Sequence, residues 1–124
     1  MRWLTILSTL LAGILGAAGT AGAALAAHGG DPRLLGTAAA MALVHAPAIL
    51  ALGLAGGGRI ASPLVPVAAL GLGVLLFSGD LAARAYLAAS LFPGAAPTGG
   101  TLVILGWLSV AVLGLIGPGR GSAD

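Results

Sequence analysis

The sequence contains no cysteine, which excludes a disulfide framework and a thiolate metal site. Lysine is also absent, and the five arginines are scattered singly without a basic stripe, which argues against nucleic-acid binding. Charged residues make up only 6% of the chain, whereas soluble domains have roughly a quarter. Hydrophobic residues make up 59%. This balance predicts an integral membrane protein whose first partner is the lipid bilayer.

Four apolar segments are long enough to cross a bilayer, which requires about 20 residues of helix. Polar turns or turns rich in glycine and proline separate them. We expect a single domain over residues 1–124, with spans at about 3–27, 34–55, 62–90 and 99–117. The predicted fold is an all-α, integral membrane four-helix bundle. The first span also imitates a secretory signal, but we expect it to be retained.

A stripe of small side chains recurs every four residues through the first span. Its members are Ala12, Gly16, Thr20 and Ala24, with His28 at its end. Small residues at this spacing let helix backbones approach closely, which is how helices associate in lipid. We therefore predict that this stripe packs against another helix.

Turn residues indicate where the helices begin and end. Asp31 and Pro32 are suited to opening the second helix, and Thr98 is suited to capping the fourth. If the third helix continued to Phe92, it would contain about 29 residues and extend about 43 Å, more than a bilayer core requires. Either this helix tilts, or its last two turns lie at the membrane interface.

Arginine placement predicts the orientation in the membrane. In a four-span arrangement Arg2, Arg59 and Arg120 fall on one side, and the opposite turns carry only Arg33, which Asp31 offsets. An excess of positive charge marks the cytoplasmic side. We expect a multi-pass protein of the inner (cytoplasmic) membrane with both termini in the cytoplasm.

Charged side chains interrupt an apolar span at Asp80 and Arg84. These residues are four positions apart, so they lie one turn apart on the same helical face. Three interpretations remain open. The pair could be an intrahelical ion pair, it could contact a charged or polar group on another subunit, or Asp80 could handle protons or cations.

The two histidines are expected to be buried polar groups. His45 lies near the middle of the second span, about 17 Å from its outer end, and is predicted to be a neutral side chain hydrogen-bonded to a neighbouring helix. A contact between His45 and Asp80 is a further hypothesis, since Asp80 would lie about 18 Å deep if its helix reached Phe92. His28 should lie near the outer surface, too far in depth for both histidines to hold one metal or haem. We expect no cofactor.

Four segments carry a family resemblance. They are residues 22–29, which end in Ala-His-Gly, residues 44–46 (Val-His-Ala), residues 77–81 (Phe-Ser-Gly-Asp-Leu), and residues 97–100 followed by Leu-Gly-Trp at 105–107. Their order and content resemble the YgdD-like family of small inner-membrane proteins, filed as domain of unknown function 423, with transmembrane protein 256 as its animal relative. The resemblance implies a four-helix integral membrane protein with no established activity.

The chain departs from the family pattern at the charged pair. Asp80 stands where that pattern has serine, and Arg84 has no counterpart in it. We predict a structural or accessory subunit, without enzymatic activity, that packs against a larger membrane protein complex; a homo-oligomer is also possible. The alternative is a small channel or transporter that uses Asp80. Trp3 and Trp107 are expected to be interface anchors or packing residues.

Overall fold

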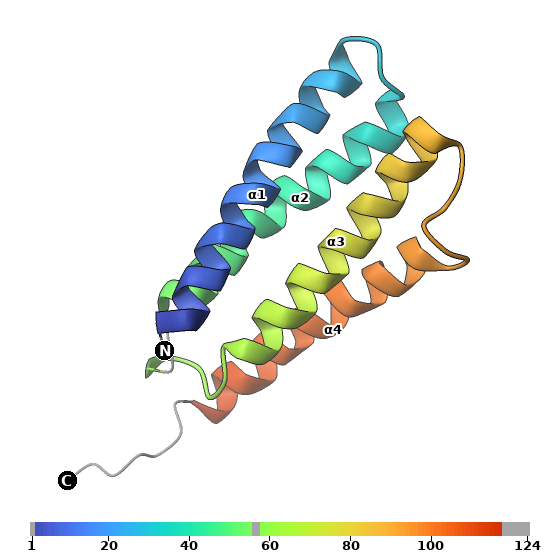
Figure 1. Ribbon diagram of the computed structural model, residues 1–124. Helices are drawn as coiled ribbons and strands as arrows, with labels where there is room; N and C mark the ends of the chain where they lie inside the picture. Colours follow the sequence, from blue (N-terminus) through green and yellow to red (C-terminus); the bar gives the residue numbers. More distant parts are fainter. Residues whose placement is uncertain (1, 56–57, 118–124) are drawn as a thin grey trace, which may run out of the picture.

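The computed structural model describes residues 2–55 and 58–117, which contain four α-helices and no strand. The helices are α1 (Arg2–Ala27), α2 (Pro32–Ala55), α3 (Leu64–Leu87) and α4 (Ala95–Ile116). They run alternately up and down through an elongated bundle (Figure 1). Each is long and apolar enough to cross a membrane. The predicted all-α, four-helix membrane fold is confirmed.

The start of α2 follows from its turn chemistry. The Oδ1 atom of Asp31 accepts hydrogen bonds from the backbone N–H groups of Arg33 at 3.0 Å and Leu34 at 2.8 Å. These donors have no partner inside the helix. Pro32 is the first helical residue, a position where the missing N–H costs nothing. Asp31 therefore caps α2.

The third helix is shorter than the sequence predicts. It ends at Leu87 after 24 residues, and does not reach position 90 or Phe92. Ala88 follows with a left-handed backbone (φ 54°), which turns the chain out of the helix. A helix of this length extends about 36 Å, close to the bilayer core, so a tilt is not required.

The fourth helix begins at Ala95, four residues earlier than the predicted residue 99. Its N-cap is Gly94 (φ 84°), and Thr98 lies inside the helix, where its hydroxyl donates to the Gly94 carbonyl oxygen at 2.8 Å. The prediction that Thr98 caps the helix is wrong because Pro97 does not interrupt it. Pro97 is the third helical residue, whose N–H would have no helical partner in any case.

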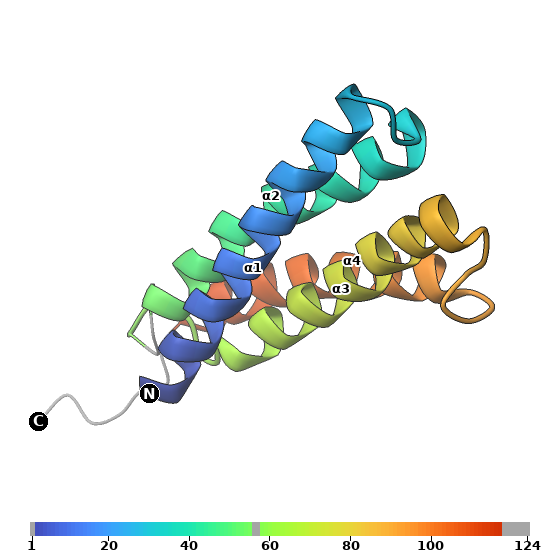
Figure 2. The ribbon, with the colours of Figure 1, turned by 45° about the horizontal axis from the view of Figure 1, so that its top comes forward.

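The four helices pair as two hairpins. α1 packs along α2, and α3 packs along α4, while α2 and α3 join the hairpins and α1 makes few contacts with α3. Figure 2 shows the hairpins diverging toward the end that carries the α1–α2 and α3–α4 turns. The core is built from aliphatic side chains of all four helices, among them Leu4, Ile49, Leu70 and Val103.

Glycines bring α3 and α4 into backbone contact. A Cβ on Gly99 would lie 2.6 Å from the Gly73 carbonyl oxygen and 2.6 Å from the Phe77 nitrogen. A Cβ on Gly73 would lie 2.8 Å from the Gly99 carbonyl oxygen. Because these neighbours are backbone atoms, a larger residue at either position would require a shift of the neighbouring helix. The resulting close approach is typical of helices that associate in lipid through packing.

The face with which α1 packs differs from the predicted stripe. Thr20 and Ala24 are exposed, and Gly16 is half-buried. A strict four-residue step moves about 40° around a helix each time, so the stripe leaves the contact face beyond Ala12. The buried residues mix steps of four and three and stay on one face. They are Leu4, Ser8, Ala12, Leu15 and Gly19.

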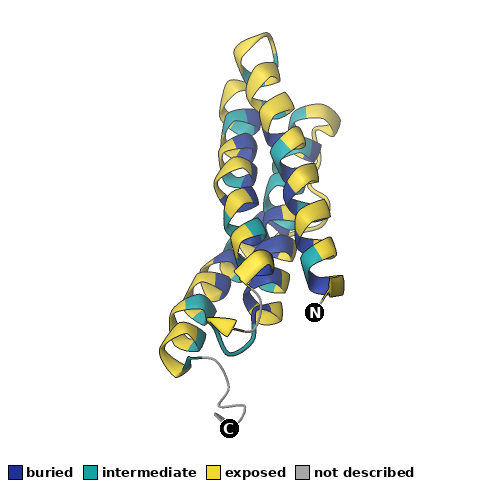
Figure 3. Cartoon of the chain, turned by 90° about the vertical axis from the view of Figure 1, so that its left-hand side faces the viewer, coloured by how far each residue is buried: buried dark blue, intermediate teal, exposed yellow. Residues whose placement is uncertain are grey.

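The outer faces of the helices are apolar. Figure 3 shows that exposed residues cover the outside of the bundle and that buried ones line its interior. Ile14, Leu105 and Leu115 are among these exposed residues, at 61%, 53% and 89%. Water would disfavour so much exposed hydrocarbon, whereas lipid accommodates it, so the surface agrees with the membrane assignment.

Two of the three arginines predicted to share one side do so. Arg2 begins α1 and Arg59 lies between α2 and α3, and both positions are at the end of the bundle where the chain begins (Figure 1). Arg120 lies outside the described residues. Arg33, at the start of α2, is at the opposite end. The orientation relative to the cytoplasm stays a prediction.

Gly99→Ala is expected to destabilise the fold, because the added Cβ would press on the backbone of α3. Overpacking of this kind costs about 1–3 kcal/mol. Thermal unfolding followed by circular dichroism in detergent should show a lower Tm. Gly114→Ala is the matched control, since no atom lies within 4 Å of its would-be Cβ. An unchanged Tm for Gly99→Ala would contradict the glycine contact.

Candidate functional site

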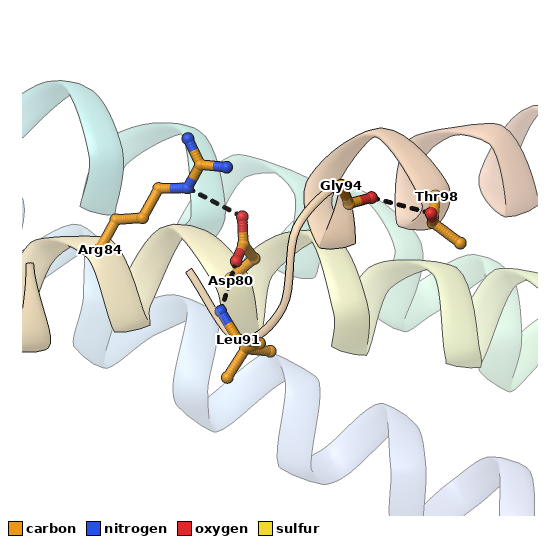
Figure 4. Close-up of polar contacts among 5 residues, drawn as sticks. All are labelled: Asp80, Arg84, Leu91, Gly94 and Thr98. Atoms are coloured by element: carbon orange, nitrogen blue, oxygen red, sulfur yellow. Dashed lines mark hydrogen bonds and ion pairs between the residues drawn. The ribbon is translucent and has the colours of Figure 1, made fainter. Parts of the chain in front are cut away.

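The Asp80 carboxylate is the centre of the candidate site. Its side chain is 0% exposed, and its Oδ2 atom lies 2.9 Å from Arg84 Nε in an ion pair within α3. Its Oδ1 atom accepts a hydrogen bond from the backbone N–H of Leu91 at 2.8 Å. Figure 4 shows the carboxylate between these two donors. Both oxygens are therefore engaged within the chain.

The shorter third helix changes the depth of this pair. Asp80 lies seven residues before the end of α3, which is about 10 Å of helix rather than the expected 18 Å. Arg84 lies in the last turn, where a cation is favoured by the helix dipole and can extend to the interface. Its side chain is 41% exposed. The pair thus lies near the membrane boundary and not at mid-membrane.

The carboxylate also fixes the connection between α3 and α4. Leu91 belongs to residues 88–94, which leave α3 and lead into α4. The hydrogen bond to Asp80 ties this segment back to the helix it has just left. Charge-assisted hydrogen bonds of this type are stronger than neutral ones. Of the three interpretations, the geometry favours a structural ion pair within the chain.

His45 links α2 to α4. The indole Nε1–H of Trp107 donates to His45 Nε2 at 3.1 Å, and His45 Nδ1 lies 2.7 Å from the Met41 carbonyl oxygen. Because an indole N–H can only donate, Nε2 must accept, so the proton lies on Nδ1 and is donated to Met41. The His45 ring is therefore neutral, buried at 5% exposure, and satisfied on both nitrogens.

Two expectations for the histidines are wrong. His45 is bonded to Trp107 and Met41 and not to Asp80, whose oxygens are taken by Arg84 and Leu91. His28 is exposed and not buried, because it follows the last residue of α1 and lies in the turn to α2.

Polar contacts between helices include two that sequence reasoning did not assign. The Ser78 hydroxyl donates to the Ala38 carbonyl oxygen at 2.8 Å and so links α3 to α2. Trp107, 43% exposed, was expected only as an anchor or packing residue. Ser78 and Trp107 both lie in segments that resemble the family pattern, and this resemblance could have indicated that they make structural contacts. Leu91 gives no such signal, since it acts through its backbone N–H.

Of the grooves on the described surface of the bundle, two contain polar side chains of interest. The larger, of about 400 Å³, is bounded by α1, α2 and α3 and includes Ala18, Gly22, Ala39 and Ser78 in its lining. We call it the inter-hairpin groove. A second, of about 320 Å³, lies between α2 and α3 and contains Arg33 and Arg84. We call it the arginine groove.

The fold and its internal polar contacts define a small helical membrane protein with four spans. The chain belongs to the family described as "Protein of unknown function (DUF423)", whose model matches residues 15–100. That range includes three of the four segments that resemble the family pattern, and residues 97–100 of the fourth. The resemblance to this family is confirmed.

A related bacterial protein agrees with the membrane assignment. The "UPF0382 membrane protein" of Haemophilus influenzae is 48% identical to this chain over 40 residues, which are 32% of each protein. The match therefore spans about a third of that relative. No solved structure matches the chain.

Asp80→Ala is expected to release residues 88–94 from α3. Removing the carboxylate leaves the Leu91 N–H without its acceptor and Arg84 without its partner, at a cost of about 1–3 kcal/mol. Hydrogen exchange measured by mass spectrometry should show faster exchange in the peptide that contains Leu91. Asp80→Asn keeps one oxygen acceptor and should retain more protection. Unchanged exchange in Asp80→Ala would contradict the tether.

Trp107→Phe is expected to lower the Tm, since it leaves a buried His45 nitrogen without a donor. Losing one partner of a buried hydrogen bond costs about 1–3 kcal/mol. Trp3→Phe is the matched control, because Trp3 is 51% exposed. Equal thermal stabilities of the two variants in detergent would show that the His45–Trp107 bond does not stabilise the bundle.

Proposed function

We propose that this chain is a non-catalytic accessory subunit that packs against a larger membrane protein complex of the inner membrane. Both termini would lie in the cytoplasm, as the arginine placement favours. The observation that carries the proposal is the inter-hairpin groove of about 400 Å³.

The lining of the groove suits packing against a transmembrane helix. It includes the small residues Ala18, Gly22 and Ala39, which allow another helix backbone to approach closely. The hydroxyl of Ser78, which also lines the groove, already donates to Ala38. The lining therefore offers packing surface rather than reactive groups, and this supports a binding role over an enzymatic one.

The unused part of the small-residue stripe provides a second surface. Thr20 and Ala24 are exposed on α1, and a Cβ on Gly16 would meet no atom within 4 Å. The Thr20 hydroxyl donates to the Gly16 carbonyl oxygen at 2.8 Å, so it brings no unsatisfied group to a contact. This half of the stripe is free to pack against a helix outside the chain.

The geometry of Asp80 does not favour the alternative of a channel or transporter. A carboxylate that handles cations needs access to water and a free acceptor. Asp80 is fully buried, both its oxygens accept hydrogen bonds, and it lines neither groove.

A photo-crosslinking amino acid at Ala18, inside the groove, is expected to capture one polytopic membrane protein at stoichiometric yield in native membranes. The same group at Ala111, an exposed alanine of α4, is the control and should capture lipid or nothing specific. Mass spectrometry identifies the adduct.

An Ala18→Trp variant extends the test. It fills the groove from an exposed position and should abolish co-purification of that protein in mild detergent, while Ala111→Trp leaves it intact. Adducts formed only with a second copy of the chain would replace the accessory role with a homo-oligomer. Adducts formed only with lipid would overturn the proposal.

A further inference from the structure

The arginine groove carries a chemistry that the accessory role does not use. It lies between α2 and α3 and has a volume of about 320 Å³. Its lining residues are Arg33, Leu34, Thr37, Phe77, Leu81 and Arg84. Two guanidinium groups from different helices thus face one cavity, beside apolar and hydroxyl-bearing side chains.

The guanidinium groups keep donors available. Arg84 uses only Nε to bind Asp80, and within the described residues its two terminal nitrogens have no acceptor. The Arg33 side chain has no acceptor there either. No acidic residue lines the groove. Within the described residues the one ion pair joins Arg84 Nε to Asp80 Oδ2, and the Oδ1 atoms of Asp80 and Asp31 accept from backbone N–H groups.

The groove is polar at one end and apolar along its length. Arg33 is the second residue of α2, and Arg84 lies three residues before the end of α3, so both are at the membrane boundary. Phe77 lies ten residues before the end of α3, which is about 15 Å from that end along the helix. Leu81 lies between Phe77 and Arg84. A phospholipid has the same order, with its phosphate at the boundary and its acyl chains below it.

We propose that this groove binds an anionic phospholipid. The terminal nitrogens of Arg33 and Arg84 donate to the phosphate oxygens, a geometry that the planar guanidinium group favours, and an acyl chain lies along Phe77 and Leu81. Basic pockets between membrane helices bind phospholipid head groups by the same chemistry. A zwitterionic lipid carries an ammonium group that offsets its phosphate, so an anionic lipid is preferred.

The Asp80–Arg84 ion pair acquires a second role in this site. The carboxylate holds Nε, which orients the rest of the Arg84 guanidinium toward the groove. Figure 4 shows these terminal nitrogens directed away from the Leu91 side of the carboxylate. Arg84 is thereby a positioned donor and not a freely moving surface charge.

The test titrates dioleoylphosphatidylglycerol or dioleoylphosphatidylcholine into the purified full chain in mild detergent. Native mass spectrometry measures the Kd of the first bound lipid. The anionic lipid is expected to bind about tenfold more tightly, a difference of about 1.4 kcal/mol. Arg33→Gln should reduce this preference to about twofold, because one of the two guanidinium groups that bind the phosphate is lost. The Arg33 side chain has no hydrogen-bond partner within residues 2–55 and 58–117, so its loss should leave the fold unchanged.

Two further variants test whether the lipid preference comes from this groove and not from overall charge or from a change in folding. Arg59→Gln removes an exposed arginine at the opposite end of the bundle and should keep the full preference. Thr37→Trp fills the groove from an exposed position without removing a charge, and should abolish the preference at unchanged Tm.

Three outcomes would overturn the proposal. Equal binding of the two lipids would show that the arginines do not select a phosphate. A loss in Arg59→Gln as large as in Arg33→Gln would show a diffuse charge effect. Competition by millimolar inorganic phosphate, with no dependence on acyl chains, would assign the groove to free phosphate. These outcomes are independent of the accessory role, which the crosslinks at Ala18 address separately.

Discussion

Lipid supplies no hydrogen bonds, and this constraint determines how the polar side chains of the four helices are placed. Exposed hydroxyls of Thr9, Thr20, Thr98 and Thr101 each donate to the carbonyl oxygen four residues earlier at 2.8 Å. The Ser109 hydroxyl also donates within its own helix, to the Gly106 carbonyl oxygen at 2.7 Å. Other polar groups join different elements, and the Thr5 hydroxyl links α1 to α2 by donating to the Gly53 carbonyl oxygen at 3.2 Å. Ser78 links α3 to α2, His45 and Trp107 link α2 to α4, and Asp80 links α3 to the segment before α4. The Ser8 hydroxyl, buried beside Gly53, is the one such buried atom without a partner in the described part of the chain.

These contacts explain how two hairpins with a limited shared core form one bundle. Within each hairpin, glycine and alanine allow close backbone packing, which requires no polar group. Between the hairpins, α2 and α3 provide most of the contact, and the hydrogen bonds from Ser78 and Trp107 cross the same boundary. Beyond this region the hairpins diverge (Figure 2). The inter-hairpin groove lies on this part of the bundle, between α1, α2 and α3. A bundle held in this way can present packing surface to a partner without losing its own core, which agrees with the accessory role proposed above.

Asp80 and Arg84 show how a charged pair can be accommodated in an apolar helix. A carboxylate in a membrane helix is costly, but near the helix end its partner Arg84 reaches the interface and its second oxygen binds a backbone N–H. Neither feature depends on a distant residue. Two local features therefore accommodate the pair: the early end of α3 and the connecting segment that turns back toward this helix. The two terminal nitrogens of Arg84 stay available to the arginine groove.

Composition and segment length alone determined that this protein is helical, membrane-embedded and built from four spans, because burying so many apolar residues in lipid leaves few other folds. The family segments were also legible in the sequence, as was the Asp80–Arg84 proximity, which depends only on helical spacing. Only the tertiary structure decided which residues meet across helices. A regular four-residue stripe drifts around α1, so Thr20 and Ala24 face outward, and the end of α3 at Leu87 moved Asp80 away from His45. Asp80 accepts from a backbone N–H in the segment that follows its own helix, and His45 accepts from an indole on another helix. Helical spacing specifies neither contact.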